Sequence, residues 1–435
     1  MEEADILIRG GTILTMSEKG TIEQGLIAIK NGKITQLRKE AGAPKIKAEK
    51  IIDGRGKVAT PGLVNCHTHV AMTVFRGIAE DQKLDEWLSK TIWPLEAKLK
   101  PKDVYDGALL GCLEMIKSGT TCLADMYFPE EMVAKAVEEA GLRATLSPGL
   151  MDVRGEDKGE KQLRESIDFI RKYHGHANGR ISACLGPHAA YTCSPDFLTK
   201  IREEASKLKV GIHIHLAESK EMMRSVKEKY GFTEVELLER IGFLKSDVLT
   251  AHCVYLTQEE MRLVAKHNVK VAYNPVANMK LALGVAKIKD LTDLGVTVGI
   301  GTDGPASNND LDMFGNMKIA ALLQKVQYMD PTVLPAQKVL EMATTDGARA
   351  LGLEKTVGSL EVGKKADIVL LDFRKPHLTP LHNIYANIVY SARGSDVDSV
   401  IVDGNILMEE REVKTLDEEE VMERAQKTAL DLLTR

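Results

Sequence analysis

Residues 61–77 read PGLVNCHTHVAMTVFRG, an apolar run that ends in two histidines separated by one residue. Alternate side chains of a β-strand point to the same face, so the imidazoles of His67 and His69 project together while Thr68 points away. Two nitrogen ligands held in this way can meet one metal ion. Taken alone, the pair also fits ordinary core or surface histidines, and the rest of the chain decides between the two interpretations.

Beyond this stretch, strand-like segments alternate with amphipathic helical segments. PEEMVAKAVEEAG and SPDFLTKIREEASKL are two of the helical stretches that follow a strand. Eight such β-α units predict a (β/α)8 TIM barrel of the α/β class, in which side chains at the C-terminal strand ends carry the function. The eight predicted strands are 62–67, 120–125, 143–148, 181–186, 210–216, 248–252, 269–273 and 296–302.

The two ends of the chain have a different pattern. Residues 4–58 contain short β-type runs, and Asn31-Gly32 between two of them is a strong hairpin signal. The β character returns after residue 355, in GSLEVGKKADIVLLDF. We therefore predict that residues 1–61 and 356–435 form one small flanking β-sandwich domain with a C-terminal helix. Residues 62–355 then form the metal-dependent barrel.

Composition and charge narrow the class of protein. The net charge is −5 and there is no basic stripe, which disfavours binding to a nucleic-acid backbone. The N-terminus MEEADILIRGG lacks the parts of a signal peptide, and no run of 18 apolar residues predicts a membrane span. The six cysteines form no C-x-x-C pair, which is typical of buried reduced thiols. We expect a cytoplasmic protein that binds neither nucleic acid nor membranes.

Histidines and carboxylates gather where the predicted barrel strands end. This clustering strengthens the metal interpretation, because chance would scatter such residues over helices and loops. The residues at or just past a strand end are His67, His69, His188, His215, Glu218, His252 and Asp303.

Some of these residues have a plainer interpretation. His213 shares a face with His215, so one of the two is a ligand and the other supports it or fills the core. His215 is preferred because it is nearer the strand end. His188 is alternatively a loop cap, and Asp303 is alternatively a helix N-cap before Gly304-Pro305.

At this point the chain resembles the amidohydrolase superfamily, and within it the 5-methylthioadenosine/S-adenosylhomocysteine deaminase (5′-deoxyadenosine deaminase) group. The resemblance covers nearly the whole chain. It is carried by PGLVNCHTHVAMTVFRGIAEDQKLDEWL, IWPLEAKL, LADMYF, GPHAAYTCS, HIHLAE, AHCVYL, NPVANMKLALG and GTDGPASNN.

The resemblance implies one divalent metal per chain, usually Zn²⁺, with Fe²⁺ or Mn²⁺ as alternatives. The ligands that it implies are His67, His69, His215 and Asp303. The fourth predicted strand carries no lysine at its end, so the carbamylated lysine that bridges two metals in some relatives is not expected.

These residue types suit hydrolytic deamination of an adenine ring. Zinc lowers the pKa of its bound water and so makes hydroxide available near neutral pH. The resemblance implies that Glu218, three residues past His215, delivers the proton that activates ring N1. Asp303 would accept the proton of water, and His252 would hydrogen-bond the hydroxide and stabilise the intermediate.

Substrate contacts follow from the same resemblance. Glu96 would accept hydrogen bonds from the two ribose hydroxyls, His188 would contact the purine, and Ser307 would lie near the metal. Arg154 would pair with the carboxylate of a homocysteine tail, with Arg164 as its rival. Three aromatic residues either wall the thioether end or pack the core: Phe75, Trp87 and Trp93.

We therefore predict zinc-dependent deamination of 5′-modified adenosines (S-adenosylhomocysteine, 5′-methylthioadenosine, 5′-deoxyadenosine, adenosine) to the inosine analogue and ammonia. One alternative is a related amidohydrolase acting on another ring, such as a guanine deaminase, triazine hydrolase or cyclic amidohydrolase. Another is a non-catalytic scaffold. Glu96 and His188 favour a riboside, and the full set of ligands argues against a scaffold. We expect a homo-oligomer, either a dimer or a tetramer, because closed homo-oligomers are usual for large soluble enzymes.

Overall fold

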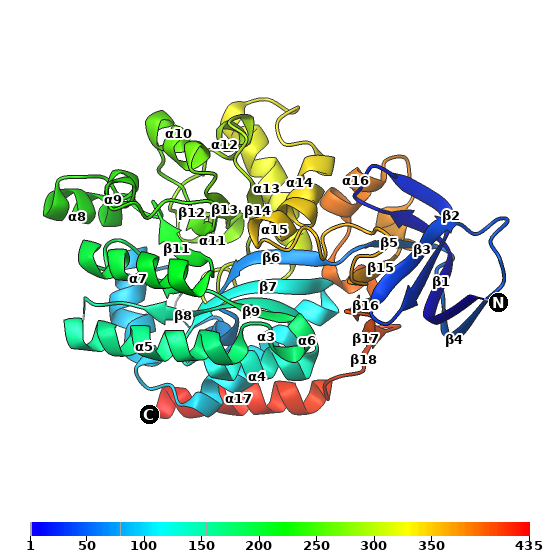
Figure 1. Ribbon diagram of the computed structural model, residues 1–435, viewed down its shortest axis with the longest axis horizontal. Helices are drawn as coiled ribbons and strands as arrows, with labels where there is room; N and C mark the ends of the chain where they lie inside the picture. Colours follow the sequence, from blue (N-terminus) through cyan, green and yellow to red (C-terminus); the bar gives the residue numbers. More distant parts are fainter. Residues whose placement is uncertain (1, 79, 154) are drawn as a thin grey trace.

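The computed structural model describes residues 2–78, 80–153 and 155–435. All eight predicted barrel strands are present, as parallel strands at the centre of the molecule (Figure 1). They are β6 (Leu63–Thr68), β7 (Thr120–Tyr127), β8 (Arg143–Leu150), β9 (Ile181–Ala183) with its continuation β10 (Gly186–Pro187), β11 (Ile212–Leu216), β12 (Val248–His252), β13 (Lys270–Tyr273) and β14 (Val298–Ile300). Strands such as β13 are buried along their whole length, as expected where helices cover a parallel sheet.

Two short junctions close the barrel. On one side, isolated parallel bridges join Leu185 to Ile212 and Ala189 to His215. On the other side, the Asp303 N–H donates to the His67 carbonyl over 2.9 Å. The second junction joins the first and last barrel strands, so barrel closure itself brings His67 and Asp303 together.

Helices surround the strands because each has one apolar stripe. In α7 (Pro195–Leu208), the Ser194 hydroxyl caps the first turn by accepting the Phe197 N–H, and Leu198 and Ile201 are buried against the barrel. The other longer helices are α3 (Pro101–Lys117), α4 (Glu130–Ala140), α5 (Glu156–Tyr173), α8 (Lys220–Tyr230), α9 (Glu234–Arg240), α10 (Gln258–Lys266), α13 (Met313–Tyr328) and α14 (Ala336–Met342). Shorter ones are α1 (Leu84–Glu86), α2 (Trp93–Glu96), α6 (His176–Gly179), α11 (Pro275–Lys280), α12 (Ile288–Asp293), α15 (Thr345–Ala350) and α16 (Ile384–Ala386), with a 3-10 turn η1 (Val70–Phe75) and a π-helical turn η2 (Trp87–Ile92).

The flanking β domain is built from both chain ends, as predicted, and its strands form one continuous mixed sheet of nine. Its strands are β1 (Glu2–Leu14), β2 (Thr21–Lys30), β3 (Lys33–Lys39), β4 (Ile46–Asp53), β5 (Lys57–Pro61), β15 (Ile368–Asp372), β16 (Val397–Val402), β17 (Asn405–Glu409) and β18 (Glu412–Val413). Antiparallel pairing of β5 with β15 joins the two ends. Asn31 and Gly32 both have positive φ in the β2–β3 turn, which confirms the hairpin. The domain boundaries themselves stay a prediction.

The C-terminal helix α17 (Glu418–Thr434) runs beside the barrel helix α3 (Figure 1). Two of its side chains bond the buried Asp106 of α3: the Thr428 hydroxyl donates over 2.8 Å and Arg424 Nη2 over 2.6 Å. Within the described part of the chain, no helix is long and apolar enough to cross a lipid bilayer.

Candidate active site

Four predicted ligands converge at the C-terminal end of the barrel. Asp303 Oδ1 lies 3.4 Å from His67 Nε2 and 3.4 Å from His69 Nε2. His69 Nε2 lies 3.3 Å from His215 Nε2. Donor atoms arranged as a tetrahedron about 2.0–2.1 Å from one centre lie ~3.3–3.4 Å apart, so these distances fit a zinc ion.

Hydrogen bonds fix which nitrogen of two histidines faces the centre. His69 Nδ1 lies 2.6 Å from the Met126 carbonyl, and His215 Nδ1 lies 2.8 Å from the His188 carbonyl. A carbonyl oxygen only accepts, so both Nδ1 atoms carry the hydrogen and both Nε2 atoms present a lone pair. Two lone pairs 3.3 Å apart repel each other unless a cation lies between them, which supports a metal ligand role for both residues.

Burial and charge hold the donors in the forms that bind metals. Burial lowers the pKa of His67 to about 4, although Asp303 acts in the opposite direction. Burial would raise the pKa of Asp303, but hydrogen bonding to His67 and the nearby histidines bring it below its ordinary value. Burial also lowers the pKa of His215. Neutral imidazoles around a carboxylate are the donor set that zinc prefers.

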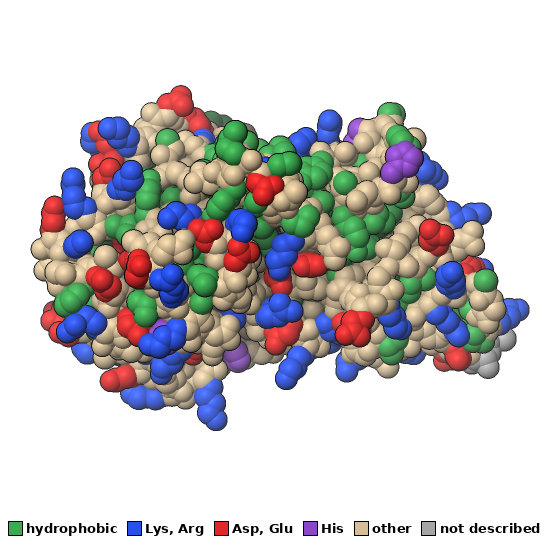
Figure 2. All heavy atoms as spheres, turned by 90° about the horizontal axis from the view of Figure 1, so that it is seen from above, with side chains coloured by type: hydrophobic (Ala, Val, Ile, Leu, Met, Phe, Trp, Pro, Cys, Tyr) green, Lys and Arg blue, Asp and Glu red, His purple; other side chains and the backbone are tan. Residues whose placement is uncertain are grey.

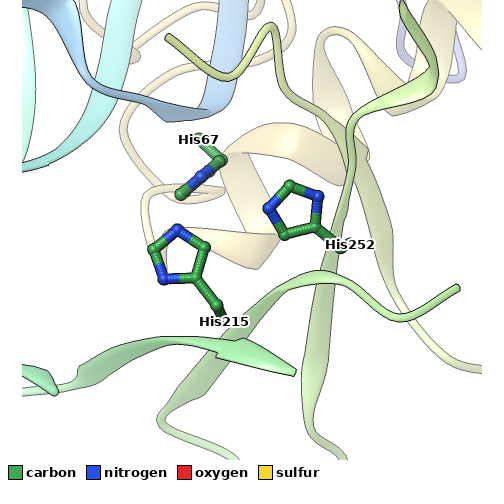
Figure 3. Close-up of side chains that lie close together, drawn as sticks. All are labelled: His67, His215 and His252. Atoms are coloured by element: carbon green, nitrogen blue, oxygen red, sulfur yellow. The ribbon is translucent and has the colours of Figure 1, made fainter. Parts of the chain in front are cut away.

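Three histidines from different strands, His67, His215 and His252, turn their rings toward one another (Figure 3). His252 ends β12, and its Nε2 atom lies 3.6 Å from Glu218 Oε1. The Glu218 side chain is only 12% exposed, and burial raises its pKa. The three predicted catalytic residues Glu218, His252 and Asp303 therefore lie around one point.

Three of the four predicted metal ligands, His69, His215 and Asp303, line a cleft with about 690 Å³ of empty space, open solvent at its mouth included. Its lining is mostly apolar with a few polar groups, as is usual for small-molecule sites. Predicted substrate residues Glu96 and His188 line the cleft, and the His188 Nδ1 atom lies 2.9 Å from Thr192 Oγ1. Its apolar wall consists of Met72, Leu84, Trp87, Leu88, Ile92, Trp93, Met126, Phe128, Met151 and Leu281.

Three other predicted residues, Ser307, Arg164 and Phe75, fall outside this lining. Ser307 is buried behind Asp303, where its hydroxyl donates to Asp303 Oδ2 over 2.8 Å. Arg164 lies on the exposed face of α5, away from the cleft lining. Arg154 lies outside the described residues. Phe75 is fully buried in the core, whereas Trp87 and Trp93 line the cleft.

The sequence did not indicate two supporting asparagines, and it did not indicate which ligand His213 supports. His252 Nδ1 lies 2.9 Å from Asn278 Oδ1 and 3.3 Å from Asn274 Nδ2, and both asparagines belong to the motif NPVANMKLALG. His213 Nε2 lies 2.9 Å from His67 Nδ1, so His213 supports a ligand and does not itself face the centre. The repeated asparagines of that motif were the available signal for their role.

Comparisons with known proteins agree with this geometry. The sequence model of the Amidohydrolase family matches residues 58–407. The chain is 51% identical to a 5′-deoxyadenosine deaminase of Methanosarcina acetivorans over 99% of both chains. It is also 51% identical to a 5-methylthioadenosine/S-adenosylhomocysteine deaminase of Desulforudis audaxviator, covering 98% of this chain and 99% of that one.

A solved structure is similar over the full length of both chains. It is an adenosine deaminase from Xanthomonas campestris with bound zinc, with a TM-score of 0.96 and 32% sequence identity. Since the family model covers most of the chain and the relatives align from end to end, the chain belongs to the amidohydrolase family.

Proposed function

We propose that the protein deaminates the adenine ring of 5′-modified adenosines, giving the inosine analogue and ammonia. The observation that carries the proposal is Glu218, a buried carboxyl group that lies beside His252 in the cleft that the predicted metal ligands also line. The deaminase names of the full-length relatives support the same reaction.

The metal that we propose is one Zn²⁺ per chain, held by His67, His69, His215 and Asp303. The spacing of their donor atoms and the zinc in the similar Xanthomonas structure support this choice. When bound, zinc supplies a hydroxide nucleophile near neutral pH by lowering the pKa of a water ligand.

The protein's own residues move the protons. In the overall reaction, water contributes its oxygen to C6 of the ring, and the amino group leaves as ammonia. Burial raises the pKa of Glu218, which favours the protonated form that can deliver a proton to ring N1. Glu218 regains a proton from the attacking water as the C6 carbonyl forms, which balances the proton given to N1. The Asp303 carboxylate accepts a proton from water and passes it toward the leaving amino group. His252 hydrogen-bonds the oxygen as it attacks and so stabilises the charge that develops there.

The cleft supports a riboside with a 5′ substituent as substrate. Glu96 offers carboxylate oxygens to the 2′ and 3′ hydroxyls of ribose, and His188 lines the same cleft, where it can contact the purine. The apolar wall suits methylthio, deoxy and thioether groups. We therefore propose 5′-deoxyadenosine, 5′-methylthioadenosine, S-adenosylhomocysteine and adenosine as substrates. A guanine or triazine substrate would leave Glu96 without ribose donors.

Ammonia release from a panel of purines tests this proposal. We expect the four adenine ribosides to be deaminated, and free adenine to be turned over ~10- to 200-fold more slowly, because adenine lacks the ribose hydroxyls that would donate to Glu96, and a hydrogen bond to a charged group contributes ~1.5–3 kcal/mol. Adenine deaminated as fast as its ribosides, or guanine as the preferred substrate, would overturn the riboside assignment.

We also propose that the protein works as a homo-oligomer in a reducing compartment such as the cytoplasm. All six cysteines are unpaired buried thiols, as expected for reducing conditions. The outward face of α13 supports self-association, since it exposes Leu322, Val326 and Met329.

A further inference from the structure

His213 lies on β11 two residues before the ligand His215, and only 1% of its surface is exposed. It contacts no described carboxylate through its ring nitrogens. Its Nε2 atom lies 2.9 Å from His67 Nδ1, and its Nδ1 atom lies 3.2 Å from Ser147 Oγ. A deeply buried histidine with both nitrogens engaged is held in one orientation.

The direction of each hydrogen bond follows from the far end of this chain. The Ser147 hydroxyl donates its hydrogen to the Asp125 carbonyl, which can only accept. Ser147 Oγ can then only accept from His213, so His213 Nδ1 carries a hydrogen. A second hydrogen on His213 would bury a cation without a counter-ion, which is costly. His213 Nε2 therefore has a lone pair.

The lone pair of His213 sets the tautomer of His67. A contact of 2.9 Å between two ring nitrogens needs one hydrogen, and here His67 Nδ1 must supply it. The His67 Nε2 atom is then left with a lone pair. It is buried without a hydrogen-bond partner in the described chain and lies 3.4 Å from Asp303 Oδ1. This is the arrangement that a metal ligand requires.

We infer that His213 and Ser147 are positioning residues, which select the metal-binding tautomer and orientation of His67. The tautomers of the other two proposed histidine ligands are set by backbone carbonyls. The Met126 carbonyl accepts from His69 Nδ1, and the His188 carbonyl accepts from His215 Nδ1. A carbonyl cannot be removed by substitution, whereas the support of His67 consists of side chains. This inference rests on the proposed metal centre and is independent of the substrate.

Zinc affinity of the metal-stripped full chain, measured by competition with a chelator, tests the inference. His213→Leu fills the buried position with an apolar side chain that has no hydrogen-bond acceptor. We expect zinc affinity to fall ~10- to 100-fold, as is usual when a hydrogen bond that supports a metal ligand is lost. His213→Gln places an amide oxygen within reach of His67 Nδ1 and should retain most of the affinity. Unchanged affinity in His213→Leu, or an equal loss in both variants, would overturn the inference.

Ser147→Ala is a second test that leaves His213 in place. Without its acceptor, His213 is free to move its hydrogen to Nε2, and we expect zinc affinity to fall. Ser182→Ala is the matched control: its hydroxyl, on the neighbouring β9, contacts Thr145 Oγ1 at 2.9 Å and lies away from the metal donors. An equal effect of both alanine variants would contradict a specific role for Ser147.

Two-bond ¹⁵N–¹H spectra of histidine-labelled protein report the tautomer directly. In the metal-free wild type, we expect His67 to carry its hydrogen on Nδ1, and in Ser147→Ala we expect the population with hydrogen on Nε2 to rise. A hydrogen on His67 Nε2 in the metal-free wild type would overturn the inference. Neither readout uses a nucleoside, so failure of the deamination panel would not affect it.

Discussion

Asp303 is the carboxylate that we propose as a metal ligand, and its Oδ1 atom lies 3.4 Å from both His67 Nε2 and His69 Nε2. Asp303→Asn keeps the shape of the side chain but removes its negative charge, so a cation would lose its counter-charge in a buried site. We expect metal content to fall from about one per chain to near zero, and activity to disappear with it. Elemental analysis of the purified variant measures this.

Ser307→Ala is the control for that substitution. It removes the hydroxyl that donates to Asp303 Oδ2 but leaves the carboxylate itself. We expect this variant to keep its metal. Two metals per wild-type chain, or full metal content in Asp303→Asn, would contradict a mononuclear centre that depends on Asp303.

We propose that Glu218 transfers a proton and does not bind the metal, so its substitution should have a different effect from that of Asp303. Glu218→Gln has the same shape but cannot give up a proton, so we expect kcat to fall by at least ~10²-fold. Metal content should stay at the wild-type level, because Glu218 is not among the four proposed ligands. Single-turnover deamination of 5′-methylthioadenosine measures the first effect, and near-normal turnover would remove Glu218 from proton transfer.

Individual site residues could be predicted where a short-range rule applied. Strand alternation linked His67 with His69, and the position of strand ends selected His215 and Asp303. His213 was predicted to be a supporting or core residue, but its partners could not be predicted, because they are His67 and Ser147, 146 and 66 residues away in sequence. Strand alternation shows that His213 points inward but not which side chain it meets.

At or just past three of the strand ends that carry the site, one residue has an unusual backbone conformation. Ala217, His252 and Asp303 all have positive φ, at 50°, 74° and 63°. Residues other than glycine rarely adopt this conformation, and such strain is concentrated at functional sites. A sequence pattern does not reveal these turns, because none of the three residues is glycine.

The turn at Ala217 is held by the first residue of a helix beyond it. Glu234 begins α9, is buried, and accepts the Ala217 N–H at Oε2 over 2.8 Å. Burial raises the pKa of Glu234 from 4.5 to about 7, and the charge of Glu218 acts in the same direction. The folded protein therefore binds the Glu234 proton more tightly than the unfolded chain does.

This difference predicts how stability depends on pH. A pKa that is higher in the folded state gives stability that is fully present below pH 4.5 and is lost as the pH rises through about 7. Glu234→Gln stays neutral and can still accept the Ala217 N–H. Relative to this variant, we expect the wild type to lose about 3 kcal/mol of unfolding free energy between pH 4 and pH 8.

Denaturant unfolding of both proteins at several pH values measures this loss. Glu236→Gln, at an exposed position of the same first turn, controls for the charge removed from the helix N-terminus. A difference between wild type and Glu234→Gln that stays constant with pH would show that burial does not change the proton affinity of Glu234.

At the scale of the whole molecule, the order of the elements and the barrel were predictable, and the exact bounds of the strands were not. The alternation of strands and helices predicts eight barrel strands, and all eight form. The meeting of the two chain ends in one sheet was also predicted from their β character. However, the single long β11 expected over 210–216 begins only at Ile212, and the fourth strand is interrupted between Ala183 and Gly186. Such breaks follow from barrel curvature, which local patterns do not contain.

The face of the molecule that carries α13 exposes an apolar stripe. The exposed fractions of Leu322 and Val326 are 42% and 68%, and their spacing of four residues places them on one side of the helix; Met329, which follows the last residue of the helix, is 87% exposed. The inward side of the same helix buries Phe314 and Met317. Figure 2, which views the molecule from above, shows hydrophobic side chains gathered on this upper face. A helix that is apolar on both sides is usually buried.

We predict that this stripe lies in an interface between copies of the chain. A two-fold axis would place the stripe of one subunit on that of its partner, so that apolar side chains meet apolar side chains on both sides. Val326→Glu would bring two carboxylates together in that contact, and we expect a lower mass by light scattering at micromolar concentration. Val362→Glu, at a site that is 55% exposed on the loop beside β3, is the control and should keep the wild-type mass. A single-chain mass for the wild type would refute the oligomer, and a wild-type mass for Val326→Glu would place the interface elsewhere.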